Sequence, residues 1–84
     1  MQVEFFGIPR ERAGISQLEV QAATLGQLLG KLSARIPSLG NFIDAKGLHP
    51  AFAASLNGDR FVSDPDTPLG PDDCVLILSA DAGG

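Results

Sequence analysis

The sequence predicts an α+β domain in which a mixed sheet of about five strands carries one main helix packed on one face. Apolar runs typical of strands occur near both ends of the chain and in its middle. One run has the three- and four-residue apolar spacing of an amphipathic helix, and it lies between the early and late strands. The 84 residues suffice for one buried core, so we expect one domain over residues 1–79 and a short tail over residues 80–84.

The first part of the chain predicts an antiparallel pair of strands. Residues 3–8 are rich in strand-forming side chains, and Pro9 should end their pairing because it lacks an amide proton. Residues 16–21 alternate between polar and apolar side chains, with Leu18 and Val20 on one face. The segment between the two runs contains a glycine and can turn the chain from one strand into the other.

A helix is predicted to begin after Thr24, whose side chain is a good N-cap, and Gln27 completes a capping box. Five apolar side chains follow at helical spacing and form one stripe: Leu25, Leu28, Leu29, Leu32 and Ile36. Pro37 should stop the helix, because proline cannot donate the next hydrogen bond. Gly30 inside the helix costs about 1 kcal/mol relative to alanine, so the helix must depend on packing.

The second half of the chain predicts a hairpin and a final strand. Residues 38–50 should form a loop or a short helical turn that places three apolar side chains against the core: Phe42, Ile43 and Leu48. Asn57-Gly58 is a strong hairpin-turn signal between strands at residues 53–56 and 60–62, because both residues tolerate positive φ. Residues 63–73 are rich in Pro and Asp and predict a surface loop before a last strand at residues 74–79.

The sheet face opposite the helix is predicted to be apolar and to bind a partner. One helix cannot cover both faces of a sheet. Successive side chains of the last strand are apolar, and Phe5 and Phe6 point to opposite faces of the first strand. Because an exposed apolar patch usually marks a partner surface, we assign Phe6, Leu76 and Leu78 to docking. The alternative is that residues 38–50 cover this face and bury the last strand on both sides.

Charge and composition exclude several classes of function. The net charge is −4, and from Asn57 onward six acids accompany a single base, which argues against nucleic acid and favours a protein partner with a basic surface. Alternatively, these Asp residues simply form turns. The single cysteine, Cys74, and the single histidine, His49, lack partners at metal-ligand spacing, so we expect both to be structural and expect no metal site. No signal peptide or membrane-spanning run is visible, so we expect a cytoplasmic protein.

The chain end is the segment with a clear chemical capability. No nucleophile elbow, phosphate-binding loop or calcium loop is present, so we expect no catalysis by side chains. The sequence ends on Gly83-Gly84, and because neither residue has a Cβ, this end can enter a narrow channel and present its carboxylate. That carboxylate becomes reactive once ATP converts it to an acyl-adenylate, which a sulfur nucleophile can attack. A chance ending without function is the alternative.

Several segments, taken in order, resemble one known family. They are Val3-Glu4-Phe5-Phe6-Gly7 followed by Arg10-Glu11-Arg12-Ala13-Gly14, then Leu56-Asn57-Gly58, Leu69-Gly70-Pro71-Asp72-Asp73-Cys74-Val75 and Gly83-Gly84. Together they resemble the MoaD/ThiS group of ubiquitin-like, β-grasp sulfur carriers over essentially the whole chain, most of all the molybdopterin synthase small subunit. Two segments depart from that pattern. Pro71-Asp72-Asp73 replaces a common Gly-Asp, and Ile77-Leu78-Ser79-Ala80 replaces an aromatic pair with prolines.

The resemblance implies a mechanism and partners. An adenylating enzyme related to ubiquitin activators would use ATP to adenylate Gly84, and persulfide sulfur would replace AMP to leave a thiocarboxylate, with no cofactor bound to the chain. As the sulfur-donating subunit of molybdopterin synthase, the chain would insert its tail into a MoaE-like large subunit during molybdenum cofactor biosynthesis. Gly84 would carry sulfur, Gly83 would give clearance, and Ala80, Asp81 and Ala82 would contact the partner.

Other roles stay open. The length of the chain favours the molybdopterin role over the thiamin carriers, which are usually shorter. A carrier for thiamin or another sulfur metabolite uses the same activation chemistry. So does a ubiquitin-like modifier joined through Gly84 to lysines, whereas a plain interaction domain would have an inert terminus.

Overall fold

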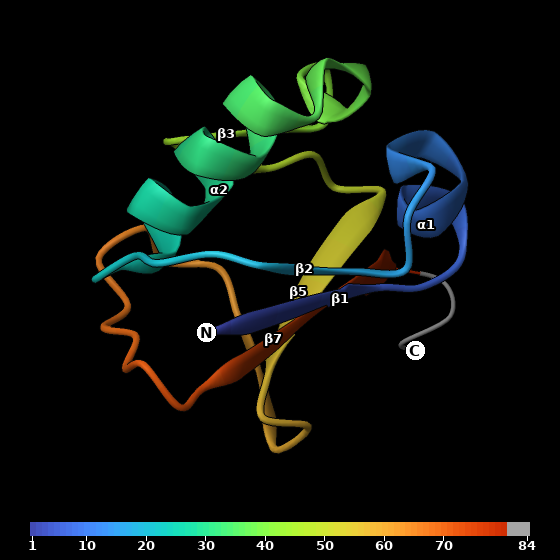
Figure 1. Ribbon diagram of the computed structural model, residues 1–84. Helices are drawn as coiled ribbons and strands as arrows, with labels where there is room; N and C mark the ends of the chain where they lie inside the picture. Colours follow the sequence, from blue (N-terminus) through green and yellow to red (C-terminus); the bar gives the residue numbers. More distant parts are fainter. Residues whose placement is uncertain (81–84) are drawn as a thin grey trace.

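The structure is a computed structural model that describes residues 1–80 (Figure 1). The elements, in chain order, are β1 (Gln2–Phe5), α1 (Ile8–Ala13), β2 (Gln17–Glu19), α2 (Leu25–Arg35), the 3-10 helix η1 (Pro37–Leu39), β3 (Ile43–Asp44), β4 (Gly47–Leu48), β5 (Phe52–Leu56), β6 (Arg60–Val62) and β7 (Cys74–Ser79). The predicted last strand at residues 74–79 is therefore confirmed with both of its bounds.

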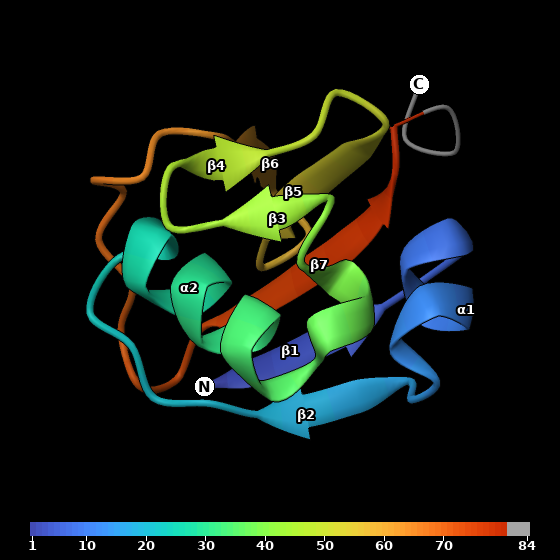
Figure 2. The ribbon, with the colours of Figure 1, turned by 90° about the horizontal axis from the view of Figure 1, so that it is seen from above.

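Five of the strands form one mixed sheet in the order β2-β1-β7-β5-β6. β1 and β7 run parallel, and the other neighbouring pairs in this sheet are antiparallel. α2 lies across one face of the sheet, and the small β3-β4 hairpin lies on the same side (Figure 1 and Figure 2). The predicted architecture, a mixed sheet with one main helix on one face, is confirmed.

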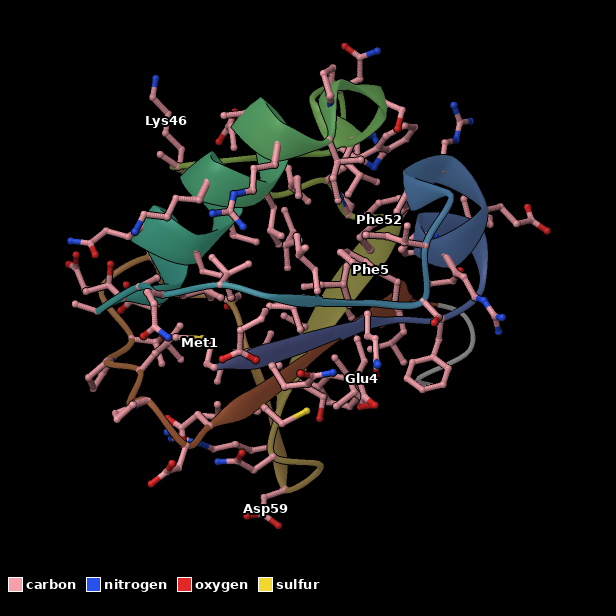
Figure 3. The ribbon with its side chains drawn as sticks, viewed as in Figure 1. Met1, Glu4, Phe5, Lys46, Phe52 and Asp59 are labelled. Carbon is pink, nitrogen blue, oxygen red and sulfur yellow. The ribbon has the colours of Figure 1, made fainter. Side chains whose placement is uncertain are left out.

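The core lies between α2 and the sheet and follows from the strand periodicity. Val3 and Phe5 of β1, like Val75 and Ile77 of β7, are buried, whereas the residues between them are half-buried. Figure 3 shows Phe5 on the α2 side of the sheet and Glu4 on the opposite side. α2 contributes four fully buried leucines, Leu25, Leu28, Leu29 and Leu32. Burying one such side chain stabilises the fold by about 1.5–3 kcal/mol, so this stripe holds the helix on the sheet.

Helix α2 begins and ends as predicted, because its end signals are local. The Gln27 amide donates to the Thr24 hydroxyl at 3.2 Å, and the Gln27 side chain accepts from the Ala23 amide at 2.9 Å. The reciprocal bond of the capping box thus reaches the residue before the cap rather than the cap itself. At the other end, Arg35 is the last α-helical residue and Pro37 opens η1.

The prediction of a strand over residues 3–8 is wrong beyond Phe5. Gly7 has φ 65° and ψ −137°, which turns the chain out of the sheet. Pro9 then lies in the first turn of α1, where its fixed φ favours a helix, and Gly14 ends α1 in the left-handed region at φ 76°. The second predicted strand is also shorter, since β2 covers Gln17–Glu19 alone.

Residues 38–50 contain more structure than the predicted loop or helical turn, because the β3-β4 hairpin follows η1. The predicted packing is confirmed: Ile43 is buried, and Phe42 and Leu48 pack against the core. β3 and β4 contact α2, on the helical side of the sheet. The alternative in which this segment covers the other sheet face is therefore wrong.

The predicted hairpin turn between β5 and β6 is confirmed, with φ 56° at Asn57 and 72° at Gly58. The Asn57 side chain also bonds to the other end of the following loop. Its Oδ1 accepts from the Cys74 amide at 2.8 Å, and its Nδ2 donates to Asp73 Oδ1 at 3.0 Å. Asp73 in turn accepts from the Gly70 amide at 2.7 Å, so the end of the surface loop is tied to the hairpin.

Candidate functional site at the base of the tail

The candidate site lies where β7 ends and the tail begins, at Ser79 and Ala80, which we call the base of the tail. β7 lies in the middle of the sheet, between β1 and β5, and ends at Ser79 beside α1 (Figure 1). The Ala80 amide donates to the Ala51 carbonyl at 2.8 Å, which holds the first tail residue against the segment before β5. Four predicted site residues, Asp81, Ala82, Gly83 and Gly84, lie outside the described residues.

The junction between β1 and α1 contacts the base of the tail from the other side, at Ser79. The Ile8 amide donates to Ser79 Oγ at 3.1 Å. Gly7 lies directly over the same hydroxyl, since a Cβ built on Gly7 would be 2.7 Å from Ser79 Oγ. The end of β7 is therefore fixed by contacts from two sides, one from α1 and one from the residue before β5.

His49, which the sequence predicted to be structural, supports the segment that holds Ala80. Its Nδ1 accepts from the Ala51 amide at 3.0 Å, and its own amide donates to the Phe42 carbonyl at 2.6 Å. The His49 ring meets Phe42 edge-on at 5.6 Å, Phe42 stacks on Phe52 at 4.8 Å, and the Arg12 guanidinium lies 4.7 Å above Phe42. This packing, with Nδ1 used as an acceptor, fits a structural histidine.

The three predicted docking residues, Phe6, Leu76 and Leu78, lie on or beside the sheet face away from α2. Phe6 is 47% exposed, and Leu76 and Leu78 are half-buried on that face. Leu76 pairs with Glu4 on one side, and Leu78 pairs with Ala53 on the other, so the apolar part of this face borders polar side chains of β1 and β2. The exposure agrees with the prediction, while docking itself stays a prediction.

Sequence reasoning missed three exposed apolar side chains. Phe61 is 59% exposed, and it pairs with Ser55, which pairs with Leu76, so Phe61 extends the same face. The signal was present in the sequence, because alternation with the buried Val62 directs Phe61 outward. Ile8, the first residue of α1, is 48% exposed, and Ile15, just after the C-cap Gly14, is 40% exposed.

Cys74 lies on the same face, and its surroundings keep the thiol protonated. Burial, together with a 3.5 Å hydrogen bond to Glu4 Oε2 and the charge of that carboxylate, raises the pKa of the Cys74 thiol. A thiol with a raised pKa is a poor nucleophile at neutral pH, which agrees with the structural role expected for it. Residues 1–80 contain no cluster of three or more side chains able to hold a metal, and none of their helices is long and apolar enough to cross a bilayer.

Comparison with protein-family models assigns the chain to a family. The model described as the ThiS family matches residues 3–84. The chain belongs to this family. The resemblance to the MoaD/ThiS group is therefore confirmed, and the match extends from β1 through α2 to the chain end. A search of curated proteins found no match.

Solved structures share the fold of this ThiS-family chain. The small archaeal modifier protein 1 from Methanosarcina acetivorans is 21% identical with a TM-score of 0.77, covering 99% of this chain and 94% of its own. A putative molybdopterin converting factor, subunit 1, from Pyrococcus furiosus is 23% identical with a TM-score of 0.77, covering 93% of both chains. A chain in the BexX/CysO complex of Amycolatopsis orientalis is 23% identical with a TM-score of 0.77, covering 99% and 98%. The ubiquitin-like β-grasp fold is thus confirmed.

Proposed function

We propose that this ThiS-family protein is a sulfur carrier that presents Gly84 as a thiocarboxylate for molybdopterin formation. The supporting observation is the geometry of β7, the central strand, which ends in a firmly held base and continues into the Gly-Gly tail. Five tail residues can extend about 17 Å, enough to enter a partner's active site while the domain stays outside. The solved Pyrococcus furiosus protein named as a molybdopterin converting factor subunit favours this pathway.

The chemistry requires little from the chain itself. The Gly84 carboxylate attacks the α-phosphate of ATP, held by an activating enzyme, and pyrophosphate leaves. A persulfide sulfur then attacks the acyl-adenylate and displaces AMP, and a second thiol cleaves the sulfur–sulfur bond to leave the thiocarboxylate. Gly83 and Gly84 offer no side chain to obstruct this attack.

Two partners follow from this chemistry: an adenylating enzyme and a MoaE-like large subunit. We propose that both dock on the apolar face formed by Phe6, Leu76 and Leu78, while residues 80–82 lead the carboxylate into their active sites. The uncovered sheet face supports this, because the chain has no other element to cover it within residues 1–80.

The test is the intact mass of the protein after incubation with ATP, a persulfide source and the cognate activating enzyme. We expect the gain of one sulfur replacing one oxygen, located on the C-terminal peptide, and no gain when Gly84 is deleted. Adding a MoaE-like subunit and the pterin precursor should then yield the dithiolene. No mass gain with a verified active enzyme would refute a carrier. A gain without dithiolene would redirect the proposal to thiamin or another sulfur metabolite.

A second candidate is a protein modifier joined through Gly84 to lysines. The shared fold with two solved small archaeal modifier proteins, from Methanosarcina acetivorans and Haloferax volcanii, favours it. Both candidates use the same acyl-adenylate, so mass spectrometry of cell extracts must separate them. C-terminal peptides of this chain joined by isopeptide bonds to lysines of other proteins would support the modifier, and their absence alongside the thiocarboxylate would support the carrier.

A further inference from the structure

Helix α1 begins without a side-chain cap of its own. Its N-cap residue is Gly7, which offers no side chain to accept a hydrogen bond from the first turn. The first amide of the helix, on Ile8, donates instead to Ser79 Oγ at 3.1 Å. The hydroxyl of a serine at the end of β7 therefore accepts from an amide that has no partner within its own helix. The two residues are 71 positions apart in the sequence.

Gly7 and Ser79 fit each other closely. A Cβ on Gly7 would lie 2.7 Å from Ser79 Oγ, closer than real Cβ contacts come, and the backbone of Gly7, at φ 65°, disfavours any other residue. Glycine at this position therefore does two things: it allows the positive φ at which the chain turns after β1, and it leaves space for the Ser79 hydroxyl. On the other side of the strand end, Ala80 is bonded to Ala51.

We infer that Ser79 is a positioning residue that sets the direction in which the tail leaves the fold. Its hydroxyl fixes the last residue of β7 against α1, beside the exposed Phe6 and Ile8 side chains, before any partner binds. A partner that docks on these side chains therefore meets Ser79 and Ala80, from which the tail leaves, already held by hydrogen bonds. The inference rests on the proposed function, because it concerns how Gly84 reaches an active site.

The benefit is preorganisation. A tail that leaves its base in one direction loses less conformational freedom on entering a channel than a tail that swings about its base. Ser79 is not one of the side chains assigned to docking, so the effect should fall on the rate of reaction at Gly84 rather than on binding of the domain. A purely structural role would change stability without this separation.

The first measurement is amide hydrogen exchange of Ile8 by NMR, which needs no partner. Ser79→Ala should speed exchange at Ile8 by about two- to tenfold, the effect of losing one hydrogen bond. Ser79→Thr keeps the hydroxyl and should restore protection. Ser63→Ala, at an exposed serine after β6, is the matched control and should leave Ile8 unchanged. Equal exchange in Ser79→Ala and the unaltered protein would overturn the inference.

The second measurement is the steady-state kinetics of thiocarboxylate formation with the activating enzyme. We expect Ser79→Ala to lower kcat by about three- to tenfold with KM unchanged, and Ser79→Thr to recover it. If the unaltered protein gains no sulfur, the proposed function fails and the positioning role fails with it. If it gains sulfur and Ser79→Ala reacts equally fast, the carrier function stands and only the positioning role is overturned.

Discussion

Two glycines in α2 should respond to alanine in opposite directions. Gly26 and Gly30 lie one turn apart in the same helix, so helix propensity alone favours alanine at both by about 1 kcal/mol. Their surroundings differ. A Cβ at Gly26 would lie 2.9 Å from the Ala45 carbonyl oxygen and 3.1 Å from Pro65 Cβ, whereas a Cβ at Gly30 would lie 3.5 Å from Ala45 Cβ. The first is a clash with backbone, and the second is an ordinary contact.

The expected changes in the free energy of unfolding follow from these distances. Gly30→Ala should raise the free energy of unfolding by about 0.5–1 kcal/mol, because the methyl group fits and the helix gains propensity. Gly26→Ala should lower it by about 1–3 kcal/mol, since overpacking costs more than the propensity gain and pushes away the adjoining loop. Two carbonyls of that loop accept hydrogen bonds from the start of α2: the Gly26 amide donates to Pro65, and the Leu25 amide donates to Thr67, both at 2.9 Å.

The assay is urea and thermal unfolding followed by far-UV circular dichroism. One kcal/mol corresponds to a change in Tm of about 4–8 °C for a domain of this size, so both effects are measurable. Each glycine serves as the control for the other, because the helix and the substitution are the same. If both variants raise Tm, then propensity rather than the Ala45 and Pro65 contacts decides the outcome, and the close approach at Gly26 is refuted.

Three further perturbations test other parts of the structure. Hydrogen bonds from the Asn57 side chain and a backbone amide lower the pKa of Asp73, so the stability that this carboxylate contributes is present above its unfolded pKa and is lost as pH falls through the lowered folded pKa. Asp73→Asn should therefore lower Tm at neutral pH and weaken the dependence of Tm on pH in the acid range, and an unchanged pH dependence would contradict this. Because burial and Glu4 raise the pKa of the Cys74 thiol, alkylation of Cys74 should be slower than that of a model thiol at pH 7. Glu4→Gln should speed this alkylation, and equal rates in Glu4→Gln and the unaltered protein would contradict the contact. Phe6→Ser should weaken binding of the activating enzyme about tenfold in calorimetry while Tm changes little, because Phe6 is exposed; undiminished affinity would remove this residue from the docking face.

Signals that act within a few residues were readable from the sequence. The start of α2 depends on Thr24 and Gln27, and the β5-β6 turn depends on Asn57-Gly58; in each case the interacting groups are close in the chain. The final strand was readable because it is a short continuous apolar run. Because successive side chains of a strand point to opposite faces, one of its two apolar faces had to lie away from the single helix.

The sequence by itself thus determined the class of the fold, its main helix and its apolar outer face, since periodicity and caps are local properties. Only the tertiary structure decided α1, the β3-β4 hairpin and the base of the tail. The six residues of α1 are too few to form a stable helix alone, and its first amide is satisfied by Ser79, far away in sequence. Contacts of that kind depend on which strands become neighbours, and the parallel pairing of β1 with β7 brings Gly7 and Ser79 together.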